Sequence, residues 1–145
     1  HTLLEEAENE RMHLLTFIGM YKPNALFRFG VLMTQGLVSN ALMFSYLLAP
    51  RVVHRFVGYL EEEAVKTYTH CLKDIDDPKG TLHSWATQPA PEIAAQYWQL
   101  PAGATMRDVI LQVRADEAHH RDVNHTFANL LEKDPNSKNP FAAGE

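Results

Sequence analysis

Apolar residues recur at helical spacing along most of the chain, and this pattern predicts an all-α protein. Helices are expected over roughly 2–20, 25–49, 52–73 and 92–99, followed by a last long helix that Thr105 caps and that runs to about 132. Prolines, glycines and aspartates separate these segments, as they do where helices end. We therefore expect one helical domain over 1–133 and a polar C-terminal tail over 134–145.

Two of the predicted helices carry apolar stripes that are polar only at their centres. The first stripe consists of Leu3, Glu6, Glu10, His13, Phe17 and Met20. The second consists of Ile110, Val113, Glu117, His120, Asn124 and Phe127. Each centre is a Glu-x-x-His motif, whose two side chains project from one side of a helix.

An ionised glutamate and a histidine in the middle of a buried stripe are costly unless they are paired or bind a metal. A satisfied polar pair would explain either motif alone. Metal binding explains Glu10, His13, Glu117 and His120 together, because facing Glu-x-x-His helices hold two metal ions in di-iron carboxylate bundles. We therefore predict Glu10, His13, Glu117 and His120 as metal ligands.

A further carboxylate candidate lies in the segment Leu60-Glu61-Glu62-Glu63-Ala64. The stripe Val57, Glu61, Ala64 and Tyr68 follows helical spacing and selects Glu61 as the inward residue, with Glu62 on a solvated face. Tyr68 on the same stripe is a redox relay, a proton donor or a buried hydrogen-bonding tyrosine, and spacing alone favours the last.

Composition narrows the chemistry of this predicted site. A net charge of −5 gives no basic surface, so nucleic acid is excluded as an expected partner. The single cysteine, Cys71, excludes internal disulfides and cysteine-rich metal sites. Eight histidines and 18 acidic residues favour oxygen and nitrogen ligation of iron or manganese. Five further histidines, which have no partner at ligand spacing, are expected in surface or capping roles: His54, His70, His83, His119 and His125.

The stretch 25–49 is nearly free of charge, with Arg28 as the exception, and is long enough to cross a bilayer. Gln35, Ser39, Asn40 and Ser45 make it too polar for a simple span. We expect a helix that lies in the membrane interface with one face in lipid, ahead of a buried core helix and of a true span.

Three blocks of sequence resemble the signature blocks of the alternative oxidase family. They are Glu5-Glu6-Ala7-Glu8-Asn9-Glu10-Arg11-Met12-His13-Leu14, Arg55-Phe56-Val57-Gly58-Tyr59-Leu60-Glu61-Glu62-Glu63-Ala64, and Arg114-Ala115-Asp116-Glu117-Ala118-His119-His120-Arg121-Asp122-Val123-Asn124-His125. The resemblance runs from Leu3 to about Leu130 and implies a ferritin-like di-iron four-helix bundle with an in-plane membrane helix. It also implies a ubiquinol oxidase that reduces O2 to water without pumping protons.

Carried over residue by residue, the resemblance makes Glu10, His13, Glu61, Glu117 and His120 ligands of two iron ions. It makes Tyr68 the redox-active tyrosine. The remaining implied site residues are Asn9 and Asp116 as partners of the ligands, Trp98 near the site, and Ala64 and Thr67 at the quinol pocket.

The resemblance further implies a sixth ligand, a glutamate in a Leu-Glu-Thr block on a preceding helix, which this sequence does not contain. We therefore expect an N-terminally incomplete domain with three of the four bundle helices. The family implies a homodimer on the matrix side of the mitochondrial inner membrane, and its bacterial members extend this to the bacterial cytoplasmic membrane.

Rival functions come from other classes. One is a different di-iron protein: a plastoquinol terminal oxidase, a demethoxyubiquinone hydroxylase or a ferritin relative. Another is a helical interaction module without enzymatic activity, which would leave the polar centres of both stripes unexplained. Oxidation of quinol with water as the product separates the oxidase from the hydroxylase and the ferritin.

Overall fold

The computed structural model describes residues 1–134, 136 and 138–141, and within these residues it is helical without a β-strand. The elements in chain order are α1 (Thr2–Tyr21), α2 (Ala25–Leu48), α3 (Pro50–Asp76), the 3₁₀ helix η1 (His83–Ala86), α4 (Glu92–Tyr97) and α5 (Met106–Lys133). The predicted all-α class is thus confirmed.

The helix boundaries follow from local chemistry. Helix α1 ends where Lys22 takes a left-handed conformation (φ 49°), and the Asn24 side chain caps α2 by accepting from the Phe27 N–H at 2.9 Å. Thr105 and Asp108 form a capping box at the start of α5. Helix α3 begins at Pro50, earlier than predicted, because proline fits the first helical turn, where its missing N–H costs nothing.

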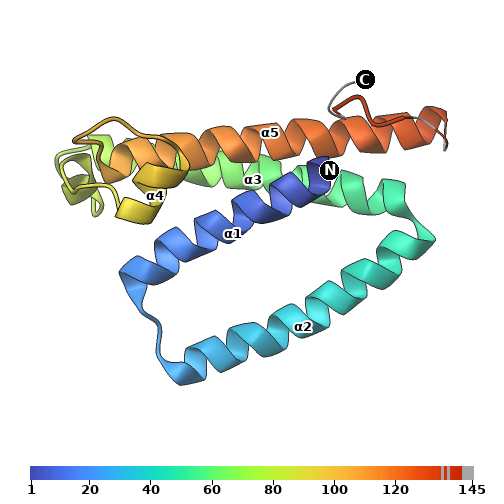
Figure 1. Ribbon diagram of the computed structural model, residues 1–145, viewed down its shortest axis with the longest axis horizontal. Coiled ribbons are helices and arrows are strands. Elements are labelled where there is room, and N and C mark those ends of the chain that lie inside the picture. The colour runs from blue at the N-terminus through green and yellow to red at the C-terminus, as the bar shows by residue number, and fades with distance from the viewer. Residues whose placement is uncertain (135, 137, 142–145) are drawn as a thin grey trace.

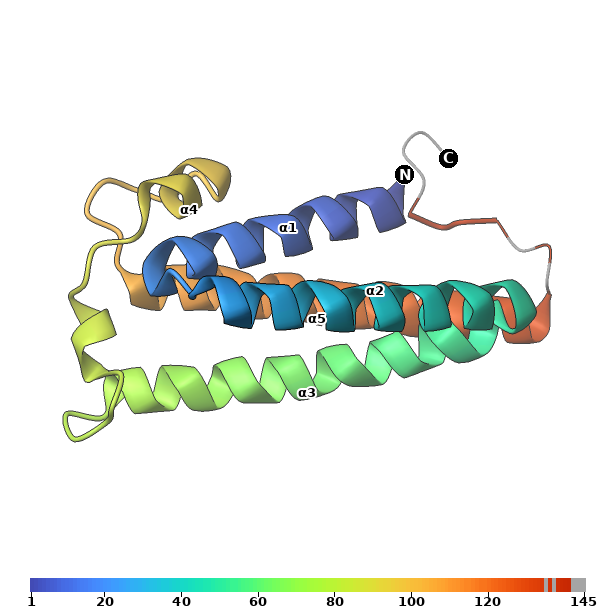
Figure 2. The ribbon, with the colours of Figure 1, turned by 90° about the horizontal axis from the view of Figure 1, so that it is seen from below.

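Helices α1, α3 and α5 form the bundle. Helices α3 and α5 run antiparallel and side by side along most of their length, and α1 lies over them (Figures 1 and 2). The inward face of α5 is buried at helical spacing, by Met106, Val109, Ile110, Val113, Glu117, His120, Val123, Asn124 and Ala128. At the α4 end, apolar side chains close the core and bound the polar residues in mid-helix on that side.

Helix α2 lies apart from the bundle (Figure 1). None of its residues is buried, and apolar side chains are exposed along it, including Leu26 (80%), Leu37 (75%) and Leu48 (87%). By length and mean hydropathy it is the one helix in the described part of the chain that could cross a membrane. An exposed apolar helix of this kind is not a core helix, so the second of the three interpretations of 25–49 is wrong.

The described residues beyond Lys133 return to the bundle. Asn139 Nδ2 donates to Thr2 Oγ1 at 3.0 Å, and the Phe141 ring contacts the rings of His119 and Phe127. These contacts place residues 139 and 141 beside the first turn of α1 and the middle of α5. Figure 2 shows the end of α5 and the start of α1 on the same side of the bundle.

Candidate metal centre

Both Glu-x-x-His motifs meet at the centre of the bundle. Glu10 from α1 and Glu117 and His120 from α5 each present a ligand atom, and these atoms lie within 4.8 Å of one another. His120 Nδ1 is 3.1 Å from Glu10 Oε1. The two stripes therefore face each other as predicted, and their polar centres form one cluster.

His13 completes the cluster from α1. Its ring is buried (5% exposed), and Nδ1 lies 3.4 Å from Glu10 Oε1 and 3.5 Å from Glu117 Oε1 without a hydrogen bond. A buried ring nitrogen that faces two carboxylates without a hydrogen bond is placed as a metal ligand would be. The donor set, imidazole nitrogens and carboxylate oxygens, suits iron or manganese.

The charges of the cluster are strongly coupled. Burial alone would raise the pKa of Glu10, but the neighbouring rings of His120 and His13 lower this pKa to about 2. Burial opposes charge on His13 too, yet Asp116, Glu10 and Glu117 raise its pKa to about 11. In the absence of a metal, a His13 imidazolium therefore supplies the positive charge that the carboxylates require.

Glu61 reaches the cluster from α3. Burial raises its pKa to about 9, helped by a hydrogen bond to Glu117 and by the negative charges of Glu117 and Glu10. Glu61 therefore keeps its proton at neutral pH in the metal-free chain. The third carboxylate candidate from the sequence thus lies near Glu117 and Glu10, outside the group of ligand atoms from Glu10, Glu117 and His120 that lie within 4.8 Å of one another.

Asp116 anchors the site from behind His13. Its Oδ2 accepts from Asn9 Nδ2 at 2.8 Å and from Trp98 Nε1 at 2.9 Å, and it lies 3.1 Å from His13 Nε2. The Trp98 ring stacks on the His13 ring, with centroids 5.8 Å apart. The expected partners Asn9, Asp116 and Trp98 are therefore brought together in one network.

Tyr68 lies between this cluster and the apolar core. It packs against buried residues of both core clusters. Burial, followed by the charges of Glu117 and Glu10, raises its pKa to about 12, so the phenol keeps its proton.

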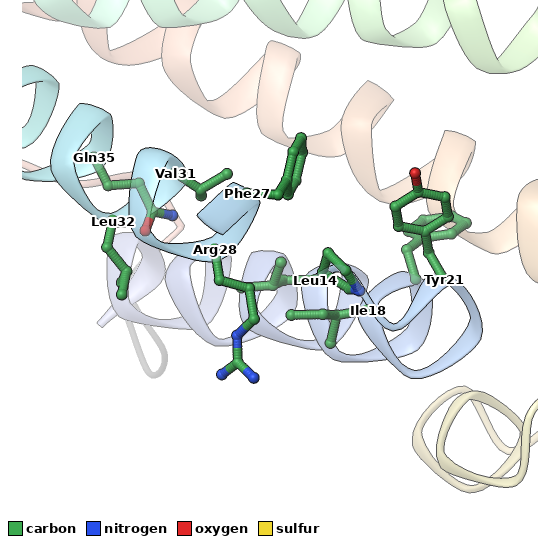
Figure 3. Close-up of a pocket in the computed structure, with 10 residues that line it drawn as sticks. Leu14, Ile18, Tyr21, Phe27, Arg28, Val31, Leu32 and Gln35 are labelled. Carbon is green, nitrogen blue, oxygen red and sulfur yellow. The ribbon is translucent and has the colours of Figure 1, made fainter. Parts of the chain in front are cut away.

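Ala64 and Thr67 lie on α3 near Glu61. Ala64 is half-buried, whereas Thr67 is exposed and donates to the Glu63 carbonyl at 2.8 Å. A separate apolar hollow of about 380 Å³ lies between α1 and α2 and includes Leu14, Ile18, Phe27 and Val31 (Figure 3). The structure does not place Ala64 or Thr67 at this hollow.

Several neighbours of the cluster were not expected from the sequence. His54 is buried (5% exposed) and hydrogen-bonded to Asn124, so its expected surface role is wrong. Glu62 was expected on a solvated face, but it is half-buried and 3.0 Å from His125 Nε2. Glu6 lies on the first stripe, but no role was predicted for it. Tyr97 was not predicted near the site either, and its hydroxyl accepts from Asn9 Nδ2 at 3.2 Å. Spacing alone gives no signal for pairs on different helices.

The fold and this donor set define a class of protein: helical bundles that can hold metal between carboxylates and histidines on facing helices. The chain belongs to the alternative oxidase family, whose model matches residues 1–129. It is 55% identical over 145 residues to "Alternative oxidase, mitochondrial" of Cryptococcus neoformans, covering 100% of this chain and 35% of that relative.

Other fungal relatives are similarly close. The identity is 56% over 144 residues both to the Ajellomyces capsulatus and to the Aspergillus niger "Alternative oxidase, mitochondrial". These matches cover 98% of this chain and 39% and 40% of the relatives. The chain thus spans well under half of the length of the relatives it matches.

Proposed function

We propose that this chain forms most of the metal centre of a ubiquinol oxidase that reduces O2 to water at two iron ions. The observation that carries the proposal is the convergence of Glu10, Glu117 and His120, with the unbonded Nδ1 of His13 beside them. Membership of the alternative oxidase family supports the same function.

Five side chains would hold the ions: Glu10, His13, Glu61, Glu117 and His120. When bound, the iron pair supplies reversible one-electron redox chemistry and a place for O2. Carboxylates suit this centre because they bridge cations and stabilise the ferric state.

The surrounding residues orient and shield the ligands. Asp116 holds His13 Nε2, which leaves Nδ1 free to face the cluster, and Asn9 and Trp98 fix the Asp116 carboxylate. The Trp98 ring, stacked on His13, covers one side of the centre. Tyr68 keeps its phenolic proton, and the influence of Glu117 and Glu10 on its pKa supports a position near the carboxylates. In this proposal it is the residue that is oxidised beside the iron ions.

The overall reaction balances without a further reductant. Two quinols each give two electrons and two protons to one O2, and the products are two quinones and two waters. We assign Ala64 and Thr67 to the quinol pocket on α3. No path for pumping protons is part of the proposal, so the reaction conserves no energy at this step.

The exposed apolar side chains of α2 support contact with a membrane, from which a lipid-soluble quinol would arrive. We propose that α2 lies in the plane of the interface, with Arg28 and the polar residues of α2 toward water. The names of the relatives support a mitochondrial location, for which we propose the matrix side of the inner membrane and a homodimer.

Iron content and quinol-dependent O2 consumption test the proposal, measured on this chain in parallel with the Aspergillus niger relative. We expect iron to bind to both proteins. In liposomes, we expect water as the product of the active protein and a quinone ring without added oxygen. A hydroxylated ring would favour the hydroxylase. Absence of iron from this chain after anaerobic loading, with the relative loaded, would contradict the proposed centre.

A further inference from the structure

Glu6 lies one helical turn before Glu10 on α1, on the same inward stripe. One of its oxygens, Oε2, accepts from Asn124 Nδ2 at 3.1 Å. The other, Oε1, is buried without a hydrogen-bond partner in the described part of the chain. A buried, unbonded carboxylate oxygen is costly, so its retention calls for a physical explanation.

The Asn124 amide is held in a fixed orientation by residues on two other helices. His54 Nδ1 lies 2.8 Å from Asn124 Oδ1, and His54 Nε2 lies 3.3 Å from the Tyr46 hydroxyl. Asn124 Nδ2 also donates to the His120 carbonyl at 3.0 Å. If the Asn124 amide were flipped, its oxygen would face a carbonyl and a carboxylate, neither of which can donate. The direction of the hydrogen bonds is therefore fixed: Tyr46 donates to His54, His54 to Asn124, and Asn124 to Glu6.

His120 lies next to this carboxylate. Both residues line one hollow of about 290 Å³ beside the cluster. Burial raises the pKa of Glu6, and the strongest opposing influence is the charge of His120. His120 directs Nδ1 toward Glu10, as His13 does, so its Nε2 is the nitrogen left for a second partner.

A comparison of the two histidines completes the argument. Metal-binding histidines donate their other ring N–H to a carboxylate or carbonyl, which fixes the ring and its basicity. For His13 on α1 that carboxylate is Asp116 on α5, 3.1 Å away. We propose that Glu6 on α1 does the same for His120 on α5: Glu6 Oε1 accepts the His120 Nε2–H when Nδ1 binds metal, with Asn124, His54 and Tyr46 holding Glu6 in place.

Glu6 is thus a positioning residue, and the inference rests on the proposed metal centre. Each helix of the facing pair would carry a metal-binding histidine and the carboxylate that orients the histidine of the other helix. The arrangement also links the centre to α2 through the contact of Tyr46 with His54, whereas none of the proposed ligands hydrogen-bonds α2 among the described residues.

Cobalt(II) is a suitable probe, because ring N–H protons of histidines bound to it give strongly shifted exchangeable NMR signals. We expect two such signals from the chain. Glu6→Gln keeps the size of the side chain but weakens the acceptor. It should shift the His120 signal and speed its exchange, leave the His13 signal in place, and lower cobalt affinity about 10–100-fold. Asp116→Asn should shift the His13 signal instead, so the two variants together assign each signal to its histidine.

Glu5→Gln is the matched control. Glu5 is the exposed neighbour of Glu6 on α1, and its substitution removes the same charge. It should leave both signals unchanged. Asn124→Ala, which releases Glu6, should speed exchange of the His120 signal, and circular dichroism verifies that each variant folds. If Glu6→Gln changed neither signal nor affinity, the inference would fail while the metal centre stood. If the unaltered chain bound no cobalt or iron, both would fail.

Discussion

His13 and Asp116 form the best-anchored contact of the centre: Nε2 of the ring lies 3.1 Å from Oδ2 of the carboxylate. The same oxygen accepts two further hydrogen bonds, from Asn9 and Trp98. The ring can therefore turn only if three partners move. This rigidity presents Nδ1 to the carboxylates before any metal arrives.

Asp116→Asn should lower metal affinity about 10–100-fold, because the amide is a weaker acceptor for the His13 N–H. Cobalt titration followed by visible absorption measures the change. Asp122→Asn on the same helix is the control, since Asp122 is exposed and pairs only with Arg121 among the described residues. Equal affinities of the two variants would remove Asp116 from the centre.

Metal binding should release at least two protons near pH 7, because the pKa of His13 is raised to about 11 and that of Glu61 to about 9 in the metal-free chain. Against the effect of burial, the contact with Glu10 and the charge of Glu6 raise the pKa of His120 as well, so His120 adds to this count. Apparent affinity should then rise about tenfold per pH unit for each proton released. Calorimetry in buffers of different ionisation enthalpy counts these protons between pH 6 and 8. A count near zero would mean that none of these groups binds the metal.

Without metal, the same groups make stability fall as pH rises. The folded-state pKa of Glu61 is raised from 4.5 to about 9, so its contribution is complete below about pH 4.5 and is lost toward pH 9. The raised pKa of His13, about 11 against 6.5, adds a loss above pH 6.5. Urea midpoints should decline from pH 5 to pH 9, and less steeply for Glu61→Gln. An identical slope in that variant would show that Glu61 is not protonated in the folded chain.

Gly58→Ala should destabilise the bundle by about 1–3 kcal/mol, because it overfills a tight contact between α3 and α5. A Cβ at Gly58 would lie 2.7 Å from His125 Nδ1, and the ring is held by Arg55 and Glu62. Gly36→Ala is the control: nothing lies within 4 Å of its Cβ position on α2. Thermal unfolding compares the two, and a stable Gly58→Ala protein would mean that the His125 ring moves freely.

Tyr68→Phe should leave metal content unchanged and lower the rate of quinol oxidation. The pKa of the phenol is about 12 in the metal-free chain, so the phenol keeps its proton and is not expected to bind metal. The charges of Glu117 and Glu10 contribute to this raised pKa. Iron analysis and oxygen uptake, measured on the same preparation, separate binding from turnover. Full activity of the variant would leave Tyr68 a packing role only.

Helical periodicity was sufficient to predict the bundle and the meeting of its polar centres. Helical spacing selects inward-facing positions, and it correctly selected Glu10, His13, Glu117 and His120. The same spacing on α3 selected Glu61. The contacts of Glu6 with Asn124 and of His54 with Asn124 join residues 118 and 70 positions apart. Such pairs depend on how helices are rotated against each other, which periodicity within one helix does not determine.

The order in which the chain is made bears on the centre. Glu10 leaves the ribosome before Glu117 and His120, which follow about a hundred positions later, with Glu61 between them. Helix α1 therefore waits without its partner while its acidic and imidazole groups remain hydrated, and α3 pairs with α5 only after α4 has emerged. Closure of the centre is a late event in folding, because such distant segments must first be brought together. A nascent chain that stops before α5 holds three of the five proposed ligands, Glu10, His13 and Glu61. Under the proposed function, iron would therefore bind only after α5 has joined the bundle.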